Sequence, residues 1–202
     1  MKKILILGGY GNFGWRISRA LVKDNIPIII CGRNKQKAQD LSDSLKIKYP
    51  DSKIEISCFD VNKELKKELV RLQPLAVINT CGPFQNSNYQ GAQNGTEEKV
   101  HYTDLSDGRD FVNNITILDA ISKDNEVLVV SGASTVPGLS SAVLEEYKNE
   151  FSEIESLIFG ISPGQRAPRG LATTKAILSY VGRKIKPFPG SEKDVYGWQG
   201  LY

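Results

Sequence analysis

The chain opens on an apolar run that passes directly into a glycine-rich turn. Lys3–Leu7 is predicted to form a buried strand, and Gly9, Gly11 and Gly14 follow it with the spacing G-x-G-x-x-G. A helical pattern then runs from Gly14 to Lys23. In such a unit one glycine permits the tight turn, one lets backbone approach a pyrophosphate, and one lets the helix pack closely on the strand. The opening therefore predicts a dinucleotide site, with the phosphates at the helix N-terminus, where free N–H groups favour anions.

Apolar runs and helical patterns alternate along most of the chain. This alternation predicts an α/β fold with a doubly wound parallel (Rossmann) sheet that is buried on both faces. Its ligand then belongs at the carboxyl ends of the strands. The expected strands are Lys3–Leu7, Pro27–Cys31, Lys53–Phe59, Ala76–Thr80, Tyr102–Leu105 and Val127–Ser131, and the expected helices are Gly14–Lys23, Asn34–Lys48, Asn62–Arg71, Asn88–Lys99 and Asp110–Asp124.

The pattern changes after about Ser134. We expect a Rossmann domain over residues 1–135, followed by a linker helix and an incomplete substrate or dimerisation domain over residues 136–202. The second part is predicted to hold a strand at Ile154–Ile161, a helix at Leu171–Val181 and an aromatic tail ending at Tyr202. So few elements cannot bury a core of their own. We therefore expect either the truncated start of a longer α/β domain or a region completed by a second copy in a homodimer.

Composition excludes several classes of function. The net charge is only +3, from 26 basic and 23 acidic residues, so nucleic acid is not an expected partner. No apolar stretch is long enough to span a bilayer, and the opening run is too short for a signal peptide. Cys31, Cys58 and Cys81 lack metal-site spacing and are expected to be small buried hydrophobes in a reducing cytoplasm. With His101 as the only histidine, no metal site is predicted.

The end of the second strand indicates which dinucleotide binds. An NAD site usually has an acidic residue there, but this strand ends Cys31-Gly32-Arg33-Asn34-Lys35. Arginine pairs with a 2′-phosphate through a rigid fork and stacks on adenine, whereas a carboxylate would repel the phosphate. The sequence therefore predicts NADP(H) rather than NAD(H). The alternative is that Arg33 is simply a solvated residue after a strand.

Two further loops are expected to contact the cofactor. Asp60 and Val61 close the third strand and are predicted to flank the adenine, although Asp60 serves equally well as an N-cap of the next helix. Thr80–Pro83 follows the fourth strand, where Gly82 permits close backbone approach and Pro83 stiffens the turn. Cys81 in this loop is expected to pack rather than act as a nucleophile, because no histidine accompanies it in sequence.

The segment from His101 to Asp107 is the candidate for catalysis. Hydride transfer to an imine or ketone needs a proton donor within hydrogen-bond reach. Tyr102 and Asp104 alternate along the fifth strand, so they share a face and are the predicted catalytic residues. The structural alternatives are that His101 only begins a strand and that Asp107 caps the helix expected near Asp110.

A short-chain dehydrogenase is a further possibility that the residues argue against. Such enzymes carry a Tyr-x-x-x-Lys pair on the helix after a serine-bearing strand. Here that strand ends at Ser131 and the next helix contains Tyr147, but Phe151 stands where lysine is required. The sequence therefore does not predict a short-chain enzyme.

Five motifs instead resemble those of the saccharopine dehydrogenase-like family of NADP-binding proteins. They are Gly8-Gly9-Tyr10-Gly11-Asn12-Phe13-Gly14, Gly32-Arg33-Asn34, Ile78-Asn79-Thr80-Cys81-Gly82-Pro83-Phe84, His101-Tyr102-x-Asp104-Leu105-x-Asp107-Gly108 and Gly132-Ala133-Ser134-x-Val136-Pro137-Gly138. The resemblance implies an N-terminal Rossmann domain that binds NADP(H) and a longer α/β substrate domain after it. It also implies an oxidoreductase acting on an amino-acid-derived imine or a carbonyl compound.

These arguments give one set of expected cofactor-binding residues and two candidate functions. The residues are Gly9, Tyr10, Gly11, Asn12, Phe13, Gly14, Arg33, Asn34, Asp60, Val61, Thr80, Cys81, Gly82 and Pro83. The first function is an NADP(H)-dependent oxidoreductase with a small-molecule substrate. The alternative is a non-catalytic dinucleotide-binding protein that acts as a redox sensor or an assembly partner.

Overall fold

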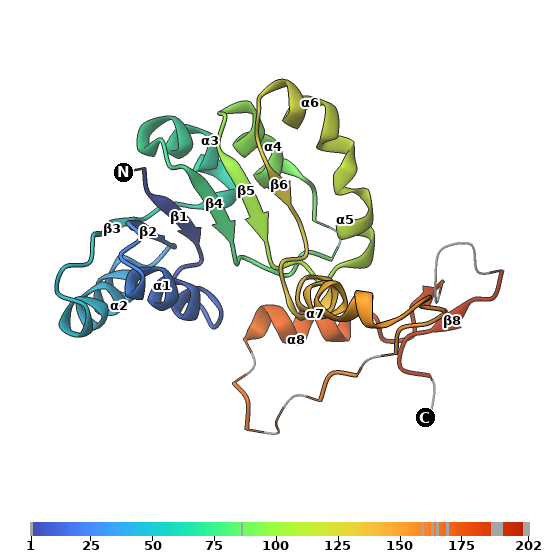
Figure 1. Cartoon of the computed structure of the whole chain (residues 1–202). Helices are drawn as coiled ribbons and strands as arrows, with labels where there is room; N and C mark the ends of the chain where they lie inside the picture. Colours follow the sequence, from blue (N-terminus) through green and yellow to red (C-terminus); the bar gives the residue numbers. More distant parts are fainter. Residues whose placement is uncertain are drawn as a thin grey trace.

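A six-stranded sheet lies at the centre of the computed structural model, which describes residues 2–85, 87–158, 160–162, 164, 166–168, 170–186 and 192–199. Every neighbouring pair of its strands is parallel, and the strand order is β3-β2-β1-β4-β5-β6 (Figure 1). The strands are β1 (Ile4–Leu7), β2 (Ile28–Cys31), β3 (Ile54–Ser57), β4 (Ala76–Asn79), β5 (His101–Asp104) and β6 (Val129–Val130). This order confirms the predicted doubly wound Rossmann sheet and places its switch point between β1 and β4.

Helices cover both faces of this sheet. The helices α1 (Gly14–Lys23) and α2 (Lys35–Lys48) pack on one face through Val22, Ala38 and Leu45. On the other face lie α3 (Val61–Leu72), α4 (Gln90–Glu97) and the segment α5 (Arg109–Asn114), η1 (Ile115–Leu118) and α6 (Asp119–Asp124). The residues of β2 are all buried, as expected for a strand covered on both sides.

Side-chain caps mark the N-termini of two helices. Asn34 Oδ1 accepts a hydrogen bond from the Lys37 N–H at 3.0 Å, so α2 begins at Lys35. Asp60 Oδ1 accepts from the Asn62 N–H at 3.0 Å, which confirms the capping role considered for Asp60. The helix expected over Asp110–Asp124 is instead divided into α5, η1 and α6.

After β6 the chain returns to the carboxyl ends of the strands. A turn, η2 (Thr135–Leu139), leads into α7 (Ser140–Tyr147) and η3 (Lys148–Glu150), and α8 (Leu171–Leu178) follows. Figure 1 shows α7 and α8 beyond the arrowheads of β4 and β5. The strands β7 (Lys184–Ile185) and β8 (Val195–Tyr196) form a small antiparallel pair. The domain division at residue 135 stays a prediction.

The prediction of a strand at Ile154–Ile161 is wrong. Residues 154–158 and 160–161 belong to no strand, and Ile158 is 93% exposed. A strand needs a hydrogen-bonded neighbour, and no described strand lies beside this segment. Tyr202 lies outside the described residues. Within the part of the chain described here, no helix is long and apolar enough to cross a membrane.

The glycine turn between β1 and α1 is packed too tightly for side chains. Gly8 adopts φ +72°, and the Gly11 N–H donates to the Gly8 carbonyl oxygen at 2.7 Å. A Cβ on Gly14 would lie 2.1 Å from that same oxygen, and a Cβ on Gly9 would lie 3.0 Å from the Ile30 side chain. The turn therefore requires glycine for close approach of helix and strand, as the sequence predicted.

We expect Gly14→Ala to lower the free energy of unfolding by about 1–3 kcal/mol, because the added methyl group meets backbone that cannot move aside. Chemical denaturation measures the change. Gly160→Ala is the control, since a Cβ there has nothing within 4 Å. Equal stability of the two variants would contradict the proposed close packing of α1 on the turn.

Candidate functional site

The N-terminus of α1 faces the glycine turn and has free donors. No side chain caps this helix, and the Trp15 and Arg16 N–H groups donate to the Gly11 and Phe13 carbonyl oxygens at 3.1 Å. Among the described residues no bond engages the Phe13 and Gly14 N–H groups, which stay available for an anion. Asn12 lies beside it and donates through Nδ2 to the Pro168 carbonyl oxygen at 3.3 Å. Arg16 Nη1 in turn donates to Asn12 Oδ1 at 2.9 Å. The predicted residues of the glycine turn are thus brought together around one helix end.

Three exposed cations lie close together in sequence after β2. Arg33 belongs to the loop between β2 and α2, Lys35 and Lys37 belong to the first turn of α2, and no acidic residue lies between them. The loop is joined to the glycine turn, because the Gly9 N–H donates to the Cys31 carbonyl oxygen and the Asn34 N–H donates to the Tyr10 hydroxyl, both at 2.9 Å. Positive charge therefore lies next to the predicted phosphate-binding turn.

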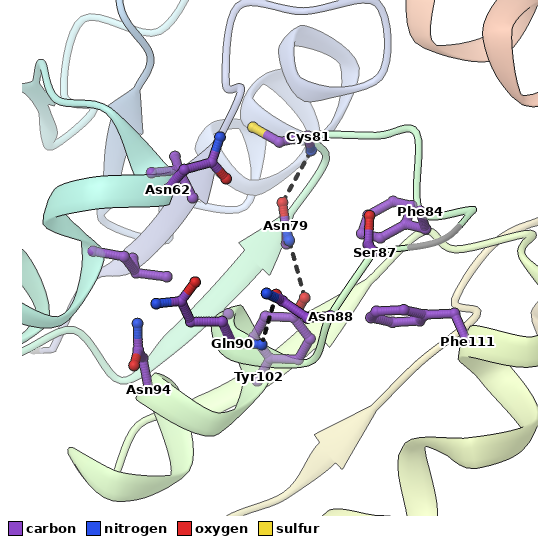
Figure 2. Close-up of a pocket in the computed structure, with 13 residues that line it drawn as sticks. Asn62, Asn79, Cys81, Phe84, Ser87, Asn88, Gln90, Asn94, Tyr102 and Phe111 are labelled. Atoms are coloured by element: carbon purple, nitrogen blue, oxygen red, sulfur yellow. Dashed lines mark hydrogen bonds between the residues drawn. The ribbon is translucent and has the colours of Figure 1, made fainter.

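A pocket of about 310 Å³ opens between α3, α4 and the loop after β4. Figure 2 shows the side chains around it, many of them amides. We call it the amide pocket, and it is lined by Val61, Asn62, Leu65, Asn79, Cys81, Phe84, Ser87, Asn88, Gln90, Gly91, Asn94, Tyr102 and Phe111. No Asp, Glu, Lys, Arg or His is among these described lining residues. Such walls suit a neutral ligand that hydrogen-bonds, with aromatic surface on one side.

A second pocket of about 320 Å³ lies on the other side of the loop after β4. We call it the apolar pocket, and its lining comes from the glycine turn, the loops after β4, β5 and β6, and α8. The lining residues are Gly11, Asn12, Phe13, Thr80, Gly82, Pro83, Phe84, Leu105, Asp107, Ser134, Gly170, Leu171, Ala172, Thr173 and Ala176. The two pockets divide the predicted residues, since Val61 and Cys81 line the amide pocket whereas Thr80, Gly82 and Pro83 line the apolar one.

The predicted catalytic residues Tyr102 and Asp104 lie inside the fold. Asp104 is fully buried, and its Oδ1 accepts hydrogen bonds from the Ser106 N–H, the Ser131 hydroxyl and the Gly132 N–H at 2.8–3.1 Å. Its Oδ2 has no hydrogen-bond partner. These bonds tie the carboxyl end of β5 to the chain that follows β6.

Tyr102, two residues before Asp104 on β5, belongs to a second group of hydrogen bonds. Asn79 Nδ2 donates to the Tyr102 hydroxyl at 2.9 Å, and Asn79 Oδ1 accepts from the Cys81 N–H at 3.0 Å (Figure 2). Burial raises the pKa of Tyr102 well above its usual range, and the nearby Asp104 carboxylate adds to this, against a smaller opposing effect of Asn79. A general acid works best with a pKa near the working pH, so this environment favours a scaffolding role. Contact of either residue with a substrate stays a prediction.

The other titratable residues singled out by the sequence have local partners. His101 Nδ1 accepts from the Leu128 N–H at 3.0 Å, at the start of β5 and away from the ligand-binding edge. Asp107 does not cap α5, since Gly108 is the N-cap and Asp107 Oδ1 accepts from Gln85 Nε2 at 2.8 Å. Asp107 nevertheless lines the apolar pocket and is exposed.

The expectation that all three cysteines are buried is wrong. Cys31 is buried, but Cys58 and Cys81 are exposed, because Cys58 directly follows β3 and Cys81 lies in the loop two residues after β4. Loss of water around its thiol raises the pKa of Cys81 to about 11, with Arg33 acting weakly in the opposite direction. A nucleophilic cysteine needs a lowered pKa, so the Cys81 environment does not favour this chemistry.

Sequence reasoning missed two contributors to this site. Asn79 was visible only as part of a motif, although its side chain joins the loop after β4 to Tyr102. The helix α8 was assigned to a separate domain, yet it forms one wall of the apolar pocket beside Gly11. A carboxamide at the last position of a strand was the available signal for Asn79, whereas no local pattern indicated where α8 would pack.

The sheet order, the glycine turn and the uncapped α1 define a dinucleotide-binding Rossmann protein. Solved structures share this fold. The NADPH-dependent reductase YwfH, which is involved in bacilysin biosynthesis, has a TM-score of 0.52 at 10% identity, covering 65% of this chain and 76% of the reductase. A short-chain oxidoreductase from Pseudomonas aeruginosa with an atypical catalytic centre has a TM-score of 0.50 at 10% identity, covering 64% of this chain and 68% of its own. A comparison with curated protein sequences gave no match.

Residues 4–146 match the family described as the saccharopine dehydrogenase NADP binding domain. This range covers most of the chain, which therefore belongs to that family, and NADP(H) is its cofactor. The structure fits such a group, because the turn at Gly9 and Gly14 leaves no room for a Cβ and the end of β2 carries cations instead of a carboxylate.

We expect Asp104→Ala to lower the free energy of unfolding by about 2 kcal/mol or more, because two buried N–H donors lose their acceptor at about 1–3 kcal/mol each and the half-buried Ser131 hydroxyl loses its partner. Asp104→Asn keeps one acceptor oxygen and should lose clearly less. Thermal and urea unfolding of the two variants measure the difference. An alanine variant as stable as the asparagine variant would show that the three hydrogen bonds are not needed.

Proposed function

We propose that this protein is an NADP(H)-dependent oxidoreductase that reduces an amino-acid-derived imine or a carbonyl compound, or catalyses the reverse reaction. The observation that carries the proposal is the arrangement of two different pockets along the loop after β4, one of which also takes Gly11, Asn12 and Phe13 of the glycine turn into its lining. One is neutral and lined by amides, and the other is largely apolar and closed on one side by α8. A dinucleotide with two unlike ends suits this arrangement.

The amide pocket suits the adenine end of the cofactor. Its wall includes Val61, which the sequence predicts to flank the adenine, and Cys81, whose pKa is raised by burial and lowered to a smaller extent by the positive charge of Arg33. Amide side chains both donate and accept hydrogen bonds, as the edge of an adenine requires. In this proposal Arg33 binds the 2′-phosphate through a charge-assisted, bidentate contact.

The apolar pocket suits the nicotinamide and the substrate. When bound, the cofactor supplies the hydride. Phe84, Ala172 and Ala176 contribute apolar surface that excludes water from the reacting groups. Asp107 is the one ionisable side chain among the described lining residues of this pocket. A carboxylate there favours the protonated form of an imine, which accepts hydride more readily than the neutral form.

A second candidate function is a dinucleotide-binding protein without catalysis, acting as a redox sensor or an assembly partner. It is favoured by the burial of Tyr102 and Asp104, which leaves the apolar pocket with few groups for acid–base work. Turnover distinguishes the two candidates, whereas cofactor binding does not. The predicted homodimer bears on the second candidate and stays a prediction.

We expect Arg33→Ala to weaken NADPH binding by about 10- to 100-fold, as the loss of a charge-assisted contact predicts, with little change for NADH. Fluorescence titration of both nucleotides measures this. Because Arg33 is exposed, the difference should shrink as salt is raised. Arg19→Ala removes an exposed cation on α1 and serves as the control for net charge. Equal weakening by both variants would argue against a specific phosphate contact at Arg33.

For the reaction, we expect oxidation of NADPH in the presence of a 2-oxo acid together with ammonia or an amino acid. Asp107→Asn should lower kcat for imine reduction by about tenfold for each pKa unit that the imine loses, without weakening NADPH binding. Absorbance of reduced nicotinamide follows turnover. Absence of turnover across a panel of oxo acids and carbonyl compounds, with NADPH binding intact, would favour the non-catalytic candidate.

A further inference from the structure

Tyr10 connects two loops that are far apart in the sequence. Its backbone belongs to the glycine turn after β1, but its side chain reaches the loop between β2 and α2. There the Tyr10 hydroxyl accepts a hydrogen bond from the Asn34 N–H at 2.9 Å. The rest of the side chain packs against the apolar cluster beneath α1 and α2. The phenol thus bonds to the residue directly after Arg33.

Gly32 makes room for this contact. A Cβ at Gly32 would lie 2.3 Å from Tyr10 Cε1 and 2.6 Å from the Tyr10 hydroxyl oxygen, which is too close for any side chain. Glycine is therefore needed at position 32 for the approach of the Tyr10 ring. Since Gly32 is buried and Arg33 is exposed, the ring supports the backbone from which the guanidinium projects.

The backbone on both sides of Arg33 is held in place. Before it, the Cys31 carbonyl oxygen accepts from the Gly9 N–H at 2.9 Å. After it, Asn34 donates its N–H to Tyr10 and caps α2 through its side chain. No hydrogen bond or ion pair among the described residues engages the Arg33 guanidinium. The hydrogen bonds therefore fix the backbone from which Arg33 projects, and the Tyr10 contact is one of them.

We infer that Tyr10 is a positioning residue for cofactor choice: its hydroxyl fixes the Gly32–Asn34 backbone, so that Arg33 projects toward the 2′-phosphate of NADP(H) from a backbone held in place. This inference rests on the role proposed above for Arg33. A loop whose backbone is already ordered loses less conformational freedom on binding, so its contact contributes more to affinity. The contribution concerns only the ligand that bears the phosphate, which makes Tyr10 a determinant of preference rather than of general binding.

The test is titration of NADPH and NADH against Tyr10→Phe, which keeps the ring and removes the hydroxyl. Loss of one hydrogen bond predicts NADPH binding weakened by about 3- to 10-fold, with NADH binding changed less than about twofold. Tyr49→Phe is the matched control, because Tyr49 packs on the same apolar cluster and its hydroxyl has no hydrogen bond to any residue that the structure describes. Gly32→Ala should reproduce the selective loss by displacing the Tyr10 ring.

A double-mutant cycle then separates positioning from a merely structural role. If Tyr10 acts through Arg33, Tyr10→Phe should have no further effect on NADPH binding in the Arg33→Ala background. Equal weakening of NADPH and NADH by Tyr10→Phe, or an undiminished effect in that background, would overturn the inference. If Arg33→Ala weakens NADPH binding and Tyr10→Phe does not, only the role of Tyr10 is wrong. If Arg33→Ala has no effect, both roles are wrong.

Discussion

The buried carboxylate of Asp104 is the interaction on which the ligand-binding edge of the sheet depends. A buried carboxylate is costly unless donors reach it, and three donors meet at Asp104 Oδ1. They come from Ser106, Ser131 and Gly132, so the bonds join the ends of β5 and β6. On the same strand, Tyr102 accepts a bond from Asn79, whose side chain also holds the loop after β4. Both pockets take lining residues from these loops, so their shapes are not independent of one another.

The sequence predicted the layers of the fold better than the roles of polar residues within it. Periodicity placed all strands of the central sheet, and α1 has the predicted bounds Gly14–Lys23, because burial on both faces leaves a strong apolar pattern. The alternation of Tyr102 and Asp104 correctly put them on one face. It could not show that α4 and the chain after β6 cover that face, since burial depends on contacts between residues far apart in sequence. The same limit explains the strand wrongly expected at Ile154–Ile161, whose apolar residues have no described strand to pair with.

The helix α8 packs against the Rossmann domain instead of standing apart from it. The sequence suggested that this region belongs to a second domain, because it is too small to bury a core. Yet Ala172 lies within reach of Gly82, where a Cβ would meet it at 3.6 Å, and Ala176 is buried. The helix is thus packed against the nucleotide-binding loops, while Leu171 and Leu178 remain exposed. One helix therefore has an inner side that completes the apolar pocket and an outer side that contributes exposed apolar surface.

The two ends of the candidate cofactor site would hold a ligand through different interactions. At the end of β2 the groups are exposed cations, whose attraction is long-ranged but screened by salt. Under α8 the groups are mostly apolar, and their contribution depends on excluding water rather than on charge. The Tyr10 and Gly32 contact lies wholly at the first end, on the α1 and α2 face, whereas the Asp104 group of side chains supports the second. Cofactor choice can consequently change through residues near β2 without altering the pocket where the reaction is proposed to occur.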